Sequence, residues 1–128
     1  MTRVKINVGP DCGNAPKKLF LKDFTVALAK GDVDFLTDCI GDHMVWEVVG
    51  ESQVTGKEDY VKAIKRHKLW KVKGMSIDTI ITHGTEASVS GQITAKDNSK
   101  FGFCNIYKFR SAGAAIVNSV RTFLVRLP

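Results

Sequence analysis

The sequence predicts an α+β fold in which three helices from the N-terminal half pack on the concave face of a cone-shaped, strongly curved antiparallel sheet. Three observations lead to this fold class. Helical periodicity is confined to residues 14–68, strand-like alternation dominates from Gly74 onward, and the later strands are joined by short turns. Strands connected by short turns pair antiparallel, and the sequence between them predicts no crossover helix that a parallel pair would need.

Two short amphipathic helices are expected near the N-terminus. Asn14 suits the N-cap of the first, Pro16 its opening turn and Gly31 its end. Asp32 suits the N-cap of the second helix, which Gly41 would terminate. Apolar residues recur at helical spacing in both segments, so each helix has one face to bury.

A strand and a third helix follow. Residues 43–49 are rich in β-branched and aromatic side chains and are closed by Gly50, which indicates a strand. After a loop, Thr55 and Glu58 have the spacing of a capping box, so we expect a helix from there to about Lys68.

The C-terminal half predicts a meander of four strands. Their sequences are MSIDTIITH, EASVSGQITA, FGFCNIYKF and IVNSVRTFLV. Gly91 and Gly102 lie inside these strands and indicate bends or bulges that curve the sheet. We therefore expect a loose arm over residues 1–13 and a single domain over residues 14–128.

Composition and cysteine usage restrict the class of protein. A chain of 128 residues with 44% hydrophobic and 25% charged residues suits an ordinary globular domain. Cys12, Cys39 and Cys104 are scattered and odd in number, which argues against a disulfide framework or a zinc site and favours a reducing compartment. With no apolar run typical of a signal peptide or a membrane span, we expect a cytoplasmic protein that does not contact a membrane.

The chain is basic, with a formal charge of +6 and a pI near 9.3. Much of the positive charge lies in residues 62–73, KAIKRHKLWKVK, which we interpret as a solvated helix face. Binding to nucleic acid usually adds stacking aromatic residues between the basic ones, and only Trp70 is available here. A nucleic-acid partner is therefore not favoured.

The order helix, helix, strand, helix and four long strands resembles the nuclear-transport-factor-2-like (NTF2-like) superfamily, which includes ketosteroid isomerases and SnoaL-like polyketide cyclases. The resemblance covers nearly all of residues 14–127. Its local carriers are the GD at Gly31, the strand VWEVVG, the TGKEDY that follows it, and the ending FRSAGAAIVNSVRTFLV. Trp46, Gly50 and Gly56 match the SnoaL-like pattern in this region. The resemblance implies a cup that binds a small apolar or cyclic ligand.

In ketosteroid isomerases the general base is an acid three residues before the Gly that closes the first strand, so the resemblance implies Glu47 as the base. A carboxylate in an apolar cup is less stable when charged, its pKa rises, and it becomes a better proton carrier near neutral pH. The alternative is that Glu47 points to solvent and Trp46 points inward, because one residue of register exchanges the two faces.

The remaining site residues depart from the isomerase pattern. The first helix has no Tyr, and the strand FGFCNIYKF has no acid. Alternation puts Asn105 and Tyr107 on one side of that strand, where either could donate a hydrogen bond to a ligand carbonyl. Residues that would line the cup, or form an ordinary core in any fold, are Phe20, Phe24, Phe35, His43, Trp46, Tyr60 and Phe103.

Three functions remain open from the sequence. The first is a SnoaL-like protein that binds a small molecule and acts as a cofactor-free isomerase, cyclase or hydratase by proton transfer on an apolar carbonyl compound. The second is a non-catalytic module that binds a ligand or forms a homodimer through the open sheet face. The third, an anion or nucleic-acid binder, rests on the net charge and the basic cluster in residues 62–73 alone. We expect no metal, because no HxH or HExxH spacing is present, and no cofactor.

Overall fold

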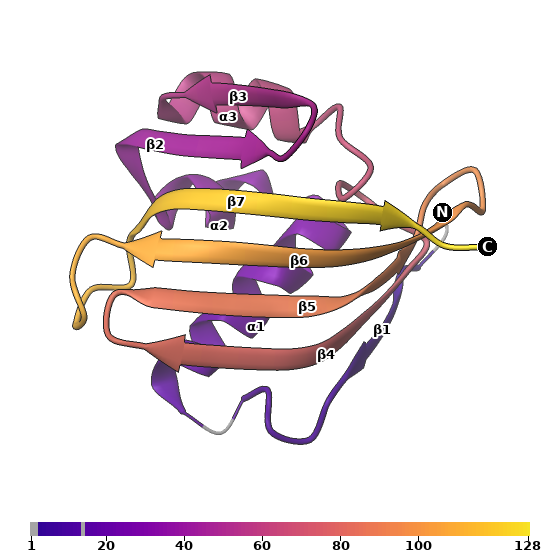
Figure 1. Ribbon diagram of the computed structural model, residues 1–128, viewed down its shortest axis with the longest axis horizontal. Helices are drawn as coiled ribbons and strands as arrows, with labels where there is room; N and C mark the ends of the chain where they lie inside the picture. Colours follow the sequence, from indigo (N-terminus) through magenta and orange to yellow (C-terminus); the bar gives the residue numbers. More distant parts are fainter. Residues whose placement is uncertain (1–2, 14) are drawn as a thin grey trace.

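Seven strands form one curved, open sheet in the computed structural model, which describes residues 3–13 and 15–128 (Figure 1). Their order across the sheet is β1-β4-β5-β6-β7-β2-β3. The strands are β1 (Lys5–Val8), β2 (Ile40–Val48), β3 (Ser52–Thr55), β4 (Gly74–His83), β5 (Glu86–Thr94), β6 (Lys100–Phe109) and β7 (Val117–Arg126). The helices are α1 (Pro16–Lys30), α2 (Val33–Asp38) and α3 (Lys57–Ile64).

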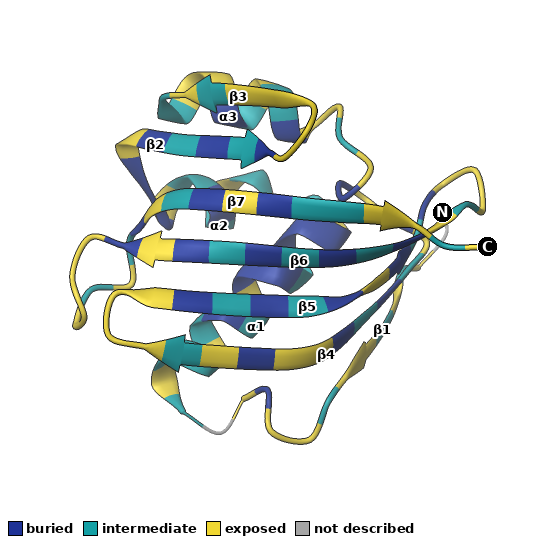
Figure 2. Cartoon of the chain, viewed as in Figure 1, coloured by how far each residue is buried: buried dark blue, intermediate teal, exposed yellow. Residues whose placement is uncertain are grey.

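All three helices lie on one side of the sheet, and the other side is left open (Figure 1). The predicted α+β class and the curved sheet with helices on its concave face are confirmed. Burial alternates along β6, whose odd-numbered residues from Phe101 to Phe109 face the helices (Figure 2). The core therefore lies between the concave face of the sheet and α1, as a two-layer fold requires.

The four-stranded meander is confirmed, but the sheet is mixed rather than wholly antiparallel. β2 pairs parallel with β7, and β1 pairs parallel with β4. In each parallel pair the two strands are far apart in the sequence, and the chain between them contains at least one helix. Reasoning from connections between consecutive strands could not detect such a pairing.

Two short strands were not predicted. Lys5–Val8, expected as part of a loose arm, forms β1 at one sheet edge. Ser52–Thr55, expected as a loop, forms β3 and pairs with β2 through a turn in which Gly50 has φ of +84°. Both strands have four residues, the shortest length at which alternation can indicate a strand.

Two boundaries of the first two helices differ from the prediction. Asn14 lies outside the described residues, and Ala15 is the N-cap residue of α1. The second helix ends at Asp38 rather than Gly41, because Ile40 already pairs with Val117 in the sheet. The Gly31 stop is confirmed, with Gly31 in the left-handed region, and so is the cap by the Asp32 carboxylate, which accepts from the Phe35 amide at 3.1 Å.

The third helix has neither the predicted start nor the predicted length. Gly56 is its N-cap residue and no side chain caps it, so the Thr55–Glu58 capping box is wrong. Thr55 is the last residue of β3, where pairing with Val45 fixes its backbone. The helix ends at Ile64, short of the predicted Lys68.

Of the two glycines expected to bend the sheet, only Gly91 lies at an irregularity. The register between β4 and β5 shifts between Ile77, which faces Gly91, and Thr79, so Asp78 is the extra residue of a bulge. Gly102 lies in regular pairing on both sides.

Candidate functional site

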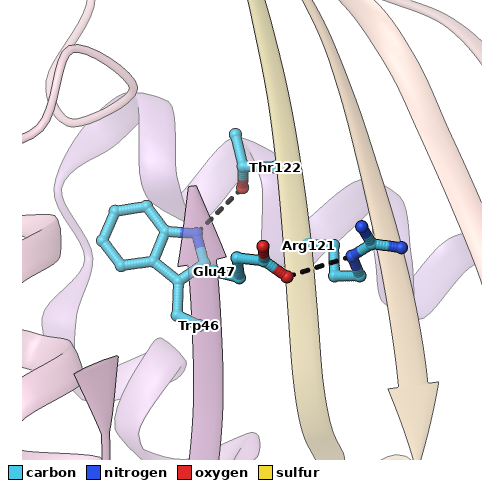
Figure 3. A network of polar contacts seen from close by, with 4 residues as sticks. All are labelled: Trp46, Glu47, Arg121 and Thr122. Atoms are coloured by element: carbon cyan, nitrogen blue, oxygen red, sulfur yellow. Dashed lines mark hydrogen bonds and ion pairs between the residues drawn. The ribbon is translucent and has the colours of Figure 1, made fainter. Parts of the chain in front are cut away.

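Trp46 points into the cup and Glu47 points away from it. Trp46 is 4% exposed, whereas the Glu47 side chain is 37% exposed and its Oε1 lies 3.2 Å from Nε of Arg121 on the convex face. Figure 3 shows the indole and the carboxylate leaving β2 in different directions. Of the two alternatives that the sequence left open, the structure has the one in which Glu47 lies outside the apolar cup.

Inside the cup, four side chains form a continuous chain of hydrogen bonds, which we call the polar relay. Trp46 Nε1 donates to Thr122 Oγ1 at 2.8 Å, and the Thr122 hydroxyl donates to Asn105 Oδ1 at 2.7 Å. Asn105 Nδ2 then donates to the Tyr107 hydroxyl oxygen at 3.4 Å. The relay thus joins β2, β7 and β6 through groups that are all buried.

The register of the sheet explains why these side chains meet. Asn105 lies directly opposite Thr122 in the antiparallel pair of β6 and β7. Trp46 faces Val120 in the parallel pair of β2 and β7, which leaves its indole diagonal to Thr122. The sequence analysis missed Thr122. The sequence indicated only a hydroxyl at an alternating position of the last strand. That Trp46 is its partner can be seen only from the parallel pairing of β2 with β7.

Burial controls the chemistry of Tyr107 at the end of the relay. It raises the pKa of Tyr107 to about 12, although hydrogen bonding with Thr25 and Asn105 acts in the opposite direction. The Phe24 ring of α1 packs edge-on against the Tyr107 ring, with centroids 5.7 Å apart. Tyr107 is therefore neutral at physiological pH and can donate or accept a hydrogen bond but cannot act as a base.

Similar architectures occur in solved structures of low sequence identity. An NTF-2-like protein of unknown function from Burkholderia xenovorans LB400 has a TM-score of 0.76 at 17% identity, over 88% of this chain and 84% of the other. A designed protein with a curved β-sheet has a TM-score of 0.70 at 15% identity, over 84% of each chain. An LEH-like epoxide hydrolase from M. tuberculosis has a TM-score of 0.67 at 18% identity, over 83% of this chain and 80% of the other.

The chain has the NTF2-like fold. No protein-family model matches the sequence, and no curated protein is similar to it at the sequence level. The fold that the sequence resembled is thus confirmed. A designed protein and an epoxide hydrolase both have an architecture similar to this one, so the fold alone does not identify an activity.

The aromatic residues predicted to line the NTF2-like cup or to form ordinary core are mostly buried in its interior. Phe24, Tyr60 and Phe103 are buried. Phe20 is half-buried and packs between the rings of Phe24 and Phe109, with centroids 6.2 and 5.8 Å away. The default interpretation of these rings, as ordinary core, therefore describes their packing.

Two other predicted lining residues, Phe35 and His43, are not fully buried. Phe35 is half-buried on α2, and His43 is exposed at the start of β2. His43 shares the outward parity of Glu47, as the sequence indicated, and both belong to the convex side. His43 is thus not part of the interior.

Trp46 is held between two further rings. The Tyr60 ring of α3 meets it edge-on with centroids 5.5 Å apart, and the His67 ring does so at 5.0 Å. His67, which the sequence did not assign, accepts a hydrogen bond from the Leu69 amide at its Nδ1, so this nitrogen carries no proton. Burial lowers the pKa of His67, Glu51 partly opposes this shift, and Lys68 adds to it.

This arrangement predicts that His67 makes stability depend on pH. Below about pH 6.5 the unfolded chain takes up a proton at His67 that the folded chain accepts only at lower pH. The free energy of unfolding should therefore decrease as the pH falls through that window, by at most about 1.4 kcal/mol per pH unit. His67→Gln should remove this part of the slope in urea titrations between pH 7.5 and 5, whereas His83→Gln, at an exposed position, should leave it unchanged. Equal slopes for both variants and the parent protein would contradict the assignment.

Each buried polar group of the relay already has a hydrogen-bond partner. Within residues 3–13 and 15–128, no buried side-chain nitrogen or oxygen lacks a hydrogen-bond partner.

Across the same residues, no three His, Cys, Asp or Glu side chains gather closely enough to hold a metal ion. No helix in this part of the chain is long and apolar enough to cross a membrane. Three hollows on the surface lie elsewhere, and none of the three is lined by a residue of the relay.

Proposed function

We propose that this protein is a non-catalytic module that forms a homodimer through the open face of its sheet, with the packed cup as the rigid centre of each subunit. One observation carries the proposal: the interior polar groups bond to one another, while Glu47 pairs with Arg121 on the other side of the sheet. Proton transfer requires a base within hydrogen-bond reach of the substrate. Among the described residues, no Asp, Glu, His, Lys or Arg side chain is buried, and the half-buried His67 packs its ring against Trp46. A cofactor-free isomerase or cyclase therefore receives less support than a binding module.

The open face carries apolar side chains that no other element covers. Ile81 and Val125 are 59% and 63% exposed. Other outward-facing apolar residues of β2, β6 and β7 are half-buried, namely Val45, Cys104, Ile106 and Phe123. Apolar side chains gathered on one sheet face are typical of a surface that contacts a partner.

Charge favours a second copy of this chain as the partner. A two-fold interface brings the same patch of each subunit together, so a patch with net charge would repel itself. On this face Glu47 pairs with Arg121, and Glu86 lies 3.9 Å from Lys108. Each of these two pairs joins an acidic and a basic group, whereas the whole chain carries +6. Two copies can meet on this face without a large electrostatic cost.

Ile106→Lys is expected to convert the dimer to a monomer. Ile106 lies opposite Arg121 in the middle of the face, and a lysine there would place a desolvated, unpaired charge at the interface. We expect the dimer dissociation constant to rise at least about 100-fold, equivalent to about 2.7 kcal/mol. Sedimentation velocity at low micromolar concentration measures the change.

Leu19→Lys is the matched control, because Leu19 is an exposed apolar residue of α1 on the helical side. It should leave the dimer intact. A parent protein that sediments as a monomer, or an Ile106→Lys variant that remains dimeric, would contradict the proposal. Unchanged circular dichroism of both variants would show that the fold is retained.

A further inference from the structure

The largest of the three surface hollows has a volume of about 990 Å³ and lies at the end of the molecule where the chain begins. It forms where the start of β1, the last residues of α1, the segment before β4 and the turn between β5 and β6 converge. Figure 1 shows the N-terminal end of β1 close to that turn. We call this hollow the cationic groove, and its lining residues are Arg3, Val4, Ile6, Ala29, Lys30, Lys71, Val72, Lys73 and Lys96.

The groove combines positive charge with an apolar floor. Five of its lining residues are Arg or Lys, and none is acidic. Val72 and Ala29 are buried beneath it, and Val4 and Ile6 of β1 are half-buried at its side. A site of this kind suits a ligand that is anionic at one end and apolar at the other.

Within residues 3–13 and 15–128, no basic residue of the groove forms an ion pair with a carboxylate. The ion pairs of the described residues involve Lys22, Lys57, Lys108 and Arg121, none of which lines the groove. The C-terminus of α1 contributes about half a negative charge, which offsets a fraction of one lysine. Asp97, in the turn next to Lys96, accepts hydrogen bonds from Ser99 instead.

Two of the lysines are held in place by backbone and side-chain contacts around them. Lys71 adopts φ of +53°, its amide donates to the Leu28 carbonyl at 3.0 Å, and its aliphatic stem lies against Gly31. The Lys73 amide donates to the Thr94 carbonyl at 2.9 Å, and its Nζ donates to Asn98 Oδ1 at 2.7 Å. Ordering these groups before a ligand arrives reduces the entropy lost on binding.

We propose that the cationic groove binds a small soluble amphiphile with a phosphate head and an aliphatic tail. The phosphate oxygens would accept charge-assisted hydrogen bonds from the lysines, and the aliphatic tail would cover the apolar floor. No aromatic residue lines the groove, so bases of a nucleic acid would find no surface to stack on. Inorganic phosphate alone would leave the apolar floor exposed. This inference does not depend on the proposed dimer.

Isothermal titration calorimetry with dodecyl phosphate below its micelle concentration tests the proposal. We expect binding at one site per chain, with inorganic phosphate and dodecyl maltoside each at least about tenfold weaker, because each offers only half of the ligand chemistry. The double variant Lys30→Gln/Lys71→Gln should weaken dodecyl phosphate binding by about tenfold or more. Lys18→Gln/Lys62→Gln removes the same charge outside the groove and should bind like the parent protein.

Three results would overturn the proposal. The first is equal loss of affinity in both double variants, which would indicate a general effect of net charge. The second is binding to phosphatidylcholine vesicles containing phosphatidic acid without binding to monomeric dodecyl phosphate, which would indicate a membrane headgroup. The third is binding of a single-stranded oligonucleotide without binding of dodecyl phosphate.

Discussion

Asn105→Ala is expected to lower the free energy of unfolding by about 3 kcal/mol or more. Asn105 is one of the two inner members of the polar relay, where it accepts from the Thr122 hydroxyl and donates to Tyr107. Its loss leaves a buried hydroxyl without an acceptor, which costs about 1–3 kcal/mol, and opens a small cavity that adds to this. Because the stability of a domain is typically about 5–15 kcal/mol, this is a large share of the total.

Equilibrium unfolding in urea at fixed protein concentration, followed by tryptophan fluorescence, measures the loss. Tyr107→Phe removes only the last hydroxyl of the relay and should cost about 1 kcal/mol. Gln53→Ala removes an exposed amide from β3 and should change stability by less than about 0.5 kcal/mol. If Asn105→Ala cost no more than Gln53→Ala, the relay would have no structural role.

Gly91→Ala is expected to destabilise the protein by about 3 kcal/mol or to prevent folding. A Cβ at Gly91 would lie 1.9 Å from the Ser76 carbonyl oxygen and 2.9 Å from the Ser76 carbonyl carbon. Both atoms belong to the backbone of β4 beside its bulge, so the clash can be relieved only by moving a paired strand. Such overpacking costs about 1–3 kcal/mol, or more where the backbone cannot yield.

Gly102→Ala is a matched control in the neighbouring strand. A Cβ there would meet Leu127 Cδ2 at 3.9 Å, an ordinary contact. Its effect on stability should be within about 0.5 kcal/mol. Thermal unfolding by circular dichroism distinguishes the two substitutions, and equal melting temperatures would contradict the steric argument.

Local patterns were sufficient for the long elements. Residue chemistry within a few positions predicts the end of the first helix at Gly31, the cap at Asp32 and the four-strand meander. Each of these features is present in the structure. That Asn105 and Tyr107 share one face of β6 also follows from alternation within one strand. Local periodicity identifies such features because they extend over many residues.

The cationic groove shows where local reasoning fails. The sequence drew attention to residues 62–73 as one basic run, but Lys62 lies outside the groove and only Lys71 and Lys73 of that run are among its lysines. Their neighbours in the groove, Lys30 and Lys96, come from distant segments. Charge counted along the chain therefore did not reveal this site.

By itself, the sequence determined which residues form long helices and strands and which side chains share a strand face, because these features depend on interactions between near neighbours. Only the tertiary structure decided that Trp46 rather than Glu47 enters the cup, and that Thr122 joins Trp46 to Asn105. The physical reason is that alternation separates two faces without saying which one is buried. That choice depends on the parallel pairing of β2 with β7, between residues more than half the chain apart.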